Sequence, residues 1–164
     1  MRRLFYILFL VGGFPIMTKD AHAMPVTEDA AVSPALPETE IKIPDDNFKL
    51  FLVEHFDYDG DGEISAPEAN AVTRMNVSTE NIASIEGIEH FTALEELVCS
   101  PANPFAKGML TSFDISRNKL LRKLKCDNNL LDTLDISRNT ALTELNCRNN
   151  NIKSLDVSRN TLLE

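Results

Sequence analysis

Apolar residues recur along the C-terminal half of the chain with a period of 21 residues. The pattern Leu-x-x-Leu-x-Cys-x-x-Asn-x-Leu/Ile begins at Leu121 and again at Leu142. A second motif, Asp-Ile/Val-Ser-Arg-Asn, begins at Asp114, Asp135 and Asp156 with the same spacing. Two successive units agree at every key position, which identifies this half of the chain as an array of internal repeats.

The first pattern is the signature of a leucine-rich repeat. Its Leu-x-Cys step predicts a short strand whose alternate side chains point inward. Less regular units begin at Val72 and Leu94, and the second of them carries an insertion of six residues within residues 101–109. We therefore predict an α/β repeat solenoid over residues 74–164, with about three to four turns and parallel strands on its concave face.

Three cysteines, Cys99, Cys126 and Cys147, occupy one inward-facing position in successive units. Cysteine serves there as a small hydrophobe, and neighbouring parallel strands place the thiols about 4.8 Å apart. Strands in parallel register aim thiols poorly for the dihedral angle of a disulfide. We expect three buried, unreactive thiols; a disulfide between neighbours and a metal site are the alternatives.

Asparagines recur at two further positions of the repeat. Asn129 and Asn150 follow the strand, and their side-chain amides should bond to backbone groups where the chain turns. Asn118, Asn139 and Asn160 form a second column, for which we expect the same role on the opposite side of the coil. We interpret both columns as structural.

A helical period precedes the repeats. Phe48, Leu52 and Phe56 recur at the spacing of one helix face, which predicts a helix that begins at residue 45 or 46. A short second helix is expected over residues 66–73. Residues 41–73 should therefore form an EF-hand-like helical cap on the repeat array.

Residues 57–68 lie between these helices and match the 12-residue calcium loop of an EF-hand at every position. Carboxylates stand at positions 1, 3, 5 and 12, and Gly62 supplies the sharp turn at position 6. Position 7 offers its backbone carbonyl, and position 9 acts through water. The predicted ligands of a Ca²⁺ ion are Asp57, Asp59, Asp61, Glu63, Ser65 and Glu68.

Only one such loop occurs in the sequence, whereas sensor EF-hands work in pairs. We therefore expect calcium to have a structural role, in which it orders the cap that closes the N-terminal end of the solenoid. The alternative is a calcium-dependent assembly element with a dockerin-like loop, for which the repeats are only a support. Dockerins carry two loops, which favours the first interpretation.

The N-terminal residues have the character of a processed segment. Two arginines precede an apolar run over residues 4–11, and Ala21-His22-Ala23 gives the small-x-small pattern of a signal-peptidase site. We expect residues 1–23 to be removed as a signal peptide and residues 24–40 to form a flexible linker. The apolar run is too short to span a bilayer. The mature protein should therefore be secreted, at the cell surface or periplasmic, and not membrane-spanning.

Charge narrows the class of partner. Residues 24–98 contain 17 acids and 3 bases, a balance that suits a cation and repels nucleic acid. Solenoids present their concave strand face to partners, and the solvent-facing strand positions vary between units here. We expect a protein or glycan ligand on this face. The candidate contact residues are Arg122, Lys123, Lys125, Thr143, Glu144, Asn146 and Arg148.

The insertion at residues 101–109 should leave the coil as a loop and adds Phe105 to the candidates. This ring either contacts the ligand or folds back over the edge of the coil, and we favour the second. The sequence stops at Glu164 just as a new unit begins, so we expect a truncated array or an open end that meets a partner. Catalysis is not expected, because only His55 and His90 follow residue 23 and no nucleophile elbow or glycine-rich phosphate loop occurs.

The chain resembles a known group of proteins in four places: residues 43–48, the loop at residues 57–68, residues 84–91 and the Leu-Asp-Val-Ser-Arg-Asn-Thr type of repeat. It resembles exported leucine-rich repeat proteins of Bacteroides-type bacteria. It is also similar, more loosely, to the capped repeat domains of internalins. The resemblance covers residues 41–164 and implies a surface-exposed or secreted binding module without catalysis. Its expected ligands are host proteins, glycans or other bacterial cells.

Overall fold

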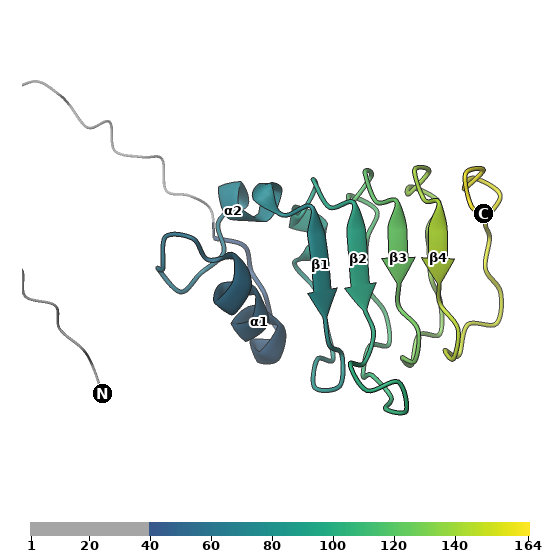
Figure 1. Ribbon diagram of the computed structural model, residues 1–164, viewed down its shortest axis with the longest axis horizontal. Helices are drawn as coiled ribbons and strands as arrows, with labels where there is room; N and C mark the ends of the chain where they lie inside the picture. Colours follow the sequence, from purple (N-terminus) through teal and green to yellow (C-terminus); the bar gives the residue numbers. More distant parts are fainter. Residues whose placement is uncertain (1–39) are drawn as a thin grey trace, which may run out of the picture. The chain divides into compact units, whose positions relative to one another are not determined.

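Residues 40–164 of the computed structural model begin with a helix–loop–helix and continue as a parallel sheet of four strands (Figure 1). The predicted signal peptide and the linker up to residue 39 lie outside the described residues. Among the residues described, no helix has both the length and the apolar character needed to cross a membrane.

Two helices form the cap, α1 (Asp46–Phe56) and α2 (Ala66–Ala71). Asp45 caps α1, because its Oδ1 atom accepts the backbone N–H groups of Asn47 and Phe48 at 3.1 and 3.0 Å. Phe48 and Leu52 lie on the inner face of α1 and are fully buried. The apolar spacing of this segment therefore produces a helix that packs on the repeats.

The second helix is shorter than predicted and ends at Ala71 instead of Thr73. Val72 already has extended backbone angles, and the Thr73 carbonyl accepts the N–H groups of Glu95 and Glu96 at 2.8 and 3.1 Å. This carbonyl joins the first repeat to the second. The helix has to end before it, because a helical Thr73 would point its carbonyl along the helix axis.

The four strands are β1 (Arg74–Val77), β2 (Glu96–Cys99), β3 (Lys123–Lys125) and β4 (Glu144–Asn146). They pair in parallel and in chain order, and the register places Leu97 beside Leu124 and Leu124 beside Leu145. Equivalent positions of successive units therefore lie side by side. The connection between β1 and β2 contains a 3₁₀ turn, η1 (Ile88–His90). The described repeats form a leucine-rich repeat solenoid whose α-helices are confined to the cap.

The core lies between the sheet and the returning segments. Val77, Cys99 and Cys126 form one fully buried column in it. Burial declines at β4, where Leu145 and Cys147 are only partly buried, because no further strand of the described chain covers them. The expectation of a buried thiol is therefore wrong for Cys147. None of the three cysteines is in a disulfide.

Two columns of asparagine join the turns of the coil. Asn118 Nδ2 donates to the carbonyls of Ile88 and Phe91 at 2.9 and 2.8 Å. Asn139 and Asn160 repeat this geometry, and each donates to two carbonyls of the turn before it. Because these side chains are buried, each amide satisfies carbonyls that water cannot reach.

The second asparagine column lies at the ends of the strands. Asn129 Nδ2 donates to the carbonyls of Cys99 and Cys126 at 2.8 and 3.3 Å. Asn150 Nδ2 donates at 2.9 Å to the carbonyls of Cys126 and Cys147. Each amide therefore bridges its own unit and the previous one.

Candidate functional site

The candidate calcium loop joins α1 to α2. Gly60 and Gly62 have positive φ angles of 78° and 87°, a region that glycine enters without steric cost. At the end of the loop, Ser65 Oγ accepts the N–H of Glu68, while Glu68 Oε2 accepts the N–H of Ser65 at 2.9 Å. This capping box fixes the start of α2. The loop therefore runs from the C-terminal end of α1 to the N-terminal end of α2, and its own Ser65 and Glu68 cap the second of these ends.

Three predicted ligands converge in the first half of the loop. Asp57, Asp59 and Asp61 each place one carboxylate oxygen so that these atoms lie within 4.8 Å of one another. Backbone groups orient them, since Asp57 accepts the N–H groups of Gly60 and Gly62 at 2.6 and 2.9 Å. Asp59 accepts the N–H of Asp61 at 3.1 Å. The turn thus gathers its carboxylates into one small volume.

The pKa values of these carboxyl groups move in opposite directions. Burial opposes ionisation of Asp57, but hydrogen bonds from Gly62 and Gly60 outweigh it and lower its pKa below the ordinary value. For Asp59, the hydrogen bond from Asp61 favours the charged form, yet burial and the charges of Asp61 and Glu68 outweigh it and raise the pKa. Like charges are therefore crowded together, which is the situation that a bound cation relieves.

The other three predicted ligands are held differently. Glu68 is buried, and its Oε1 atom accepts the N–H of Tyr58 at 2.7 Å across the loop. Glu63 turns its carboxylate toward α1, where Lys49 Nζ lies 2.5 Å from it, so its backbone carbonyl is the group left for a metal. Ser65 Oγ donates to Glu68 at 3.0 Å. The donors are all oxygens, as Ca²⁺ requires, and the residues present fit this ion.

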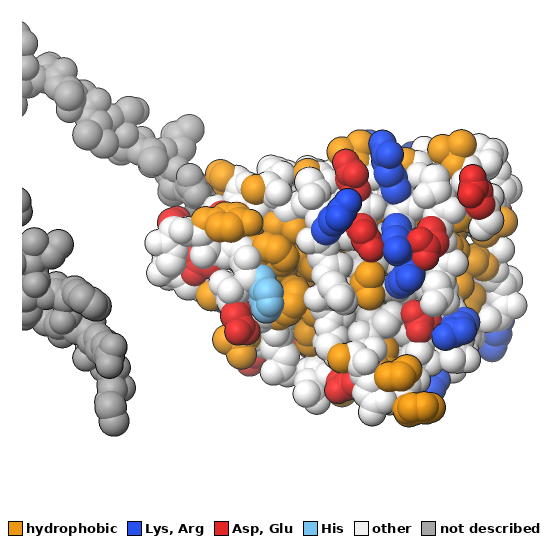
Figure 2. Space-filling view, viewed as in Figure 1, with side chains coloured by type: hydrophobic (Ala, Val, Ile, Leu, Met, Phe, Trp, Pro, Cys, Tyr) orange, Lys and Arg blue, Asp and Glu red, His pale blue; other side chains and the backbone are white. Residues whose placement is uncertain are grey.

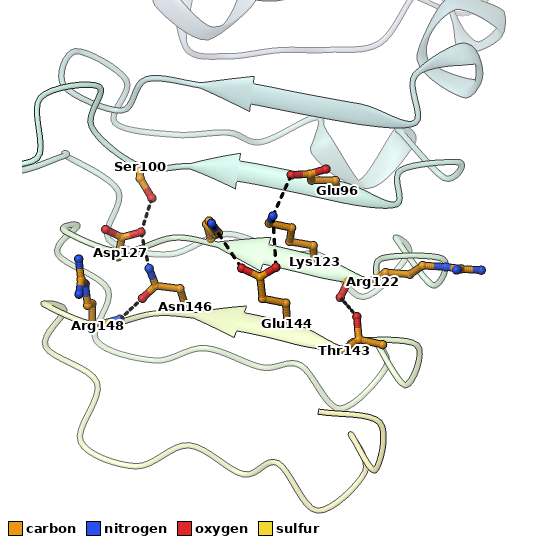
Figure 3. Close-up of polar contacts among 10 residues, drawn as sticks. Glu96, Ser100, Arg122, Lys123, Asp127, Thr143, Glu144, Asn146 and Arg148 are labelled. Carbon is orange, nitrogen blue, oxygen red and sulfur yellow. Dashed lines mark hydrogen bonds and ion pairs between the residues drawn. The ribbon is translucent and has the colours of Figure 1, made fainter. Parts of the chain in front are cut away.

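The solvent-facing side of the sheet carries a row of alternating charge. Arg74, Glu96, Lys123 and Glu144 are in register on the four strands. Lys123 Nζ lies 3.4 Å from Glu96 and 3.2 Å from Glu144, and Lys125 Nζ lies 3.3 Å from Glu144 (Figure 3). The sheet therefore brings together three candidate contact residues, but their charges neutralise one another. Figure 2 shows acidic and basic side chains interleaved over this face.

These ion pairs shift the pKa values of the groups that form them. The hydrogen bond to Glu144 raises the pKa of Lys123, and the same bond lowers the pKa of Glu144. Both groups are therefore charged throughout the neutral range. A partner that meets this row encounters paired charges, not a basic patch.

A second polar network lies at the end of the strands, around Asp127. Ser100 Oγ and Asn146 Nδ2 both donate to Asp127 Oδ1 at 3.0 Å (Figure 3). Asn128 Nδ2 donates to Asp127 Oδ2 at 2.7 Å. Asn146 Oδ1 accepts the backbone N–H of Arg148 at 3.4 Å. The candidates Asn146 and Arg148 therefore belong to one network that spans three units.

Two candidates lie at the edge of this surface. Thr143 Oγ1 donates to the Arg122 carbonyl at 3.1 Å. The Arg122 side chain is exposed and points away from the ion pairs (Figure 3). The structure does not bring it together with Lys123 and Lys125, although the three are close in sequence.

Glu96 and Asp127 are central to the two networks but are not among the residues selected from the sequence. Glu96 lies on β2, where the register places it beside Lys123, whereas Asp127 is half-buried and follows the end of β3. Aligning the units and comparing charges across them would have identified Glu96, because Lys123 and Glu144 occupy its position in the next two units.

The insertion at residues 101–109 places Phe105 in solvent, with 95% of the residue exposed. The expectation that this ring folds back over the coil is therefore wrong. The loop is fixed by other groups: Lys107 Nζ donates to the carbonyls of Asn129 and Asn149 at 3.4 and 3.2 Å. Gly108 N–H donates to the Asn128 carbonyl at 2.7 Å. These bonds satisfy the loop without its aromatic ring.

The parallel strands, the 21-residue units and the two asparagine columns define a leucine-rich repeat protein. It has an internalin-like architecture and is similar to solved structures from Listeria monocytogenes. One is the functional domain of InlJ, whose structure includes a cysteine ladder: 37% identity, TM-score 0.64, with 73% of this chain and 25% of that chain covered. Another is the internalin InlF: 24% identity, TM-score 0.56, with 74% of this chain and 35% of that chain covered. The chain spans about a quarter and a third of their lengths. No protein-family model and no curated protein matches the sequence.

Proposed function

We propose that this protein is an extracellular binding module that recognises a protein or glycan partner through its strand face, and that Ca²⁺ in the loop at residues 57–68 stabilises its cap. The observation that carries this proposal is the strand face itself. It displays ordered polar side chains from three or more units on a rigid sheet. The likeness to internalins and the resemblance to exported repeat proteins support an extracellular binding role without catalysis.

The chemistry of this face favours a partner of mixed polarity. Its lysines are paired with glutamates, so it offers no field that would attract nucleic acid or another polyanion. Its hydrogen-bonding groups are held by their neighbours, which reduces the ordering cost of binding. Arg122 and Arg148 are exposed at its edges, where a guanidinium group can form bidentate contacts with carboxylates of a partner.

Capture of a partner from host or bacterial surface extracts tests the strand-face proposal. Lys125→Glu places a repelling charge beside Glu144 in the middle of the face, so it should abolish capture. Lys119→Glu makes the same charge change at an exposed position outside the strands and should leave capture intact. Equal capture by both variants, once circular dichroism shows that both are folded, would contradict the proposal.

Thermal unfolding with and without calcium tests the role of the ion. Extracellular calcium modules bind at about 10⁻⁴–10⁻³ M. At 10 mM calcium this affinity corresponds to about 1.4–2.7 kcal/mol of added stability, or several degrees in melting temperature. Asp57→Ala and Glu68→Ala should abolish the rise, whereas Asp132→Ala, an exposed aspartate of the repeats, should preserve it. If calcium leaves the melting temperature of the unmodified protein unchanged, the proposal that the ion stabilises the cap is wrong.

A calcium-dependent assembly role for the cap is the second candidate, and two exposed side chains favour it. Leu50 on α1 is 65% exposed and Tyr58 in the loop is 68% exposed. Leu50 also lines a shallow apolar pocket with Val53 and Gly62. If the cap is the binding surface, Leu50→Asp abolishes capture of the partner and Lys125→Glu does not.

A further inference from the structure

Residues 40–43, the N-terminal strap, lie between the candidate calcium loop and the first repeat unit. The backbone N–H of Ile41 donates to the Ile64 carbonyl at 2.9 Å. Ile64 is the eighth residue of the calcium loop and is fully buried. Ile41 and Ile43 are buried as well, while Lys42 between them is exposed. The strap therefore pairs with the loop through its backbone and faces the core with alternate side chains.

The other side of the strap rests on Gly87, at the start of η1. Gly87 has a φ angle of 105°, and a Cβ atom there would lie 3.0 Å from Ile43 Cγ1 and 3.4 Å from the Lys42 carbonyl oxygen. The strap thus contacts the loop on one side and the repeat array on the other. A displacement of Ile64 in the loop would be transmitted to residues 41–43 through the hydrogen bond from Ile41.

Contacts from outside the loop concentrate on two of its residues. Lys49 of α1 bonds to the Glu63 carboxylate, and the strap bonds to Ile64. Glu63 is also the residue whose backbone carbonyl would bind the ion. In contrast, the carboxylates of Asp57 and Asp61 accept N–H groups from within the loop itself. The second half of the loop is therefore positioned by its surroundings, and the first half is free to adjust around a cation.

We propose that the N-terminal strap is a positioning element for calcium: docking of Ile41 on Ile64 holds the Glu63 carbonyl and Glu68 in binding geometry and so sets the affinity of the loop. The inference rests on the proposed calcium site. Linkage requires the reverse effect to the same degree, so bound calcium also holds the strap in place. Calcium then protects the peptide bond after Lys42, where the chain enters the folded unit.

Calorimetric titration of the full chain with calcium tests the first half of this proposal. Ile41→Ala keeps the charge of the loop and removes the side chain that docks the strap, so it should weaken calcium binding about tenfold, within the range of coupling between linked sites. Ile136→Ala is the matched control, because Ile136 is as deeply buried but lies in the repeats. It should lower the melting temperature and leave the calcium dissociation constant unchanged.

Limited trypsin digestion tests the second half. Calcium should slow cleavage after Lys42 about tenfold in the unmodified protein and should have no effect in Asp59→Ala, which lacks one of the three convergent carboxylates. Unchanged affinity in Ile41→Ala, or cleavage after Lys42 that is indifferent to calcium, would overturn the role of the strap while leaving the calcium site in place. A full chain that does not bind calcium at all would instead overturn the site itself.

Discussion

Replacing Gly108 by alanine should destabilise the protein strongly, although the change adds a single methyl group. A Cβ atom on Gly108 would lie 2.1 Å from Asn129 Oδ1 and 2.2 Å from Thr79 Oγ1, whereas ordinary contact begins near 3.4 Å. Both neighbours are fully buried, and Thr79 Oγ1 donates to Asn129 Oδ1 at 2.8 Å. The methyl group would have to displace one of them or push the insertion away from the coil.

The cost has two parts. Overpacking a buried site costs about 1–3 kcal/mol. If Asn129 moves, its bond to Thr79 and its bond to the Cys99 carbonyl at 2.8 Å are at risk, and each buried group left without a partner costs about 1–3 kcal/mol. Loss of a glycine also reduces the conformational entropy of the unfolded chain, which offsets only about 0.4–1 kcal/mol of this cost. We therefore expect a net loss of about 2–4 kcal/mol, a large fraction of a typical stability of about 5–15 kcal/mol.

Urea unfolding followed by circular dichroism measures this loss as a lower midpoint with an unchanged slope. Gly60→Ala is the matched control, because nothing lies within 4 Å of its Cβ position and only its φ angle of 78° resists the change, at about 1–2 kcal/mol. In a Thr79→Ala background the cost of Gly108→Ala should fall, since one of the two crowded atoms is gone. A Gly108→Ala variant that is as stable as the unmodified protein would refute the packing argument.

Three further predictions follow from single contacts. Asp45→Ala removes the cap of α1 and the acceptor for the backbone N–H groups of residues 83 and 84. It should lower the free energy of unfolding, measured by urea titration, by about 1–2 kcal/mol. An unchanged free energy of unfolding would contradict a stabilising role for these bonds. Burial raises the pKa of Cys99 and of Cys126 far more than that of Cys147, so iodoacetamide should label Cys147 first in the native protein, and equal labelling of all three would exclude the assigned burial. The backbone N–H of Ser137 donates to the Asp135 carboxylate and lowers its pKa in the folded protein. This bond therefore stabilises the fold above the ordinary pKa of 3.8, and its contribution is lost as the pH falls through the lowered value. Asp135→Asn should show a smaller acid-induced drop in the urea midpoint than the unmodified protein.

The regular part of the fold follows from the sequence because one period controls it. A spacing of 21 residues places Leu124 and Leu145 at equivalent positions, and backbone pairing then puts them side by side. The asparagines at a fixed distance from these leucines bond to the carbonyls of the neighbouring turn for the same reason. Each unit repeats the same local solution, so identifying the period is enough to predict the parallel solenoid.

The candidate contact surface on the strands is harder to predict from the sequence, because its geometry depends on contacts between units. Arg122, Lys123 and Lys125 form a basic run in the sequence, but Glu96 and Glu144 on neighbouring strands neutralise the two lysines. Alternation along a strand gives the face of each side chain, and only the register gives its neighbours. The predicted calcium ligands within residues 57–68 differ in this respect, since all six belong to one 12-residue segment and their spacing can be compared directly with that of an EF-hand loop.

In the irregular units, the contacts between turns could not be predicted from the repeat pattern. Asn129 stands eight residues after the first leucine of its unit, and in the unit that begins at Leu94 the same position holds Ala102. That unit therefore lacks an amide to bridge its turn to the one before. The insertion supplies a contact instead, because its Met109 N–H donates to the Thr79 carbonyl at 2.9 Å. The Thr79 hydroxyl in turn donates to Asn129, which lies two units after Thr79. The repeat pattern reveals that an asparagine of this column is absent from the unit. The group that replaces it comes from the insertion, a segment with no counterpart in the other units, so the pattern does not predict it.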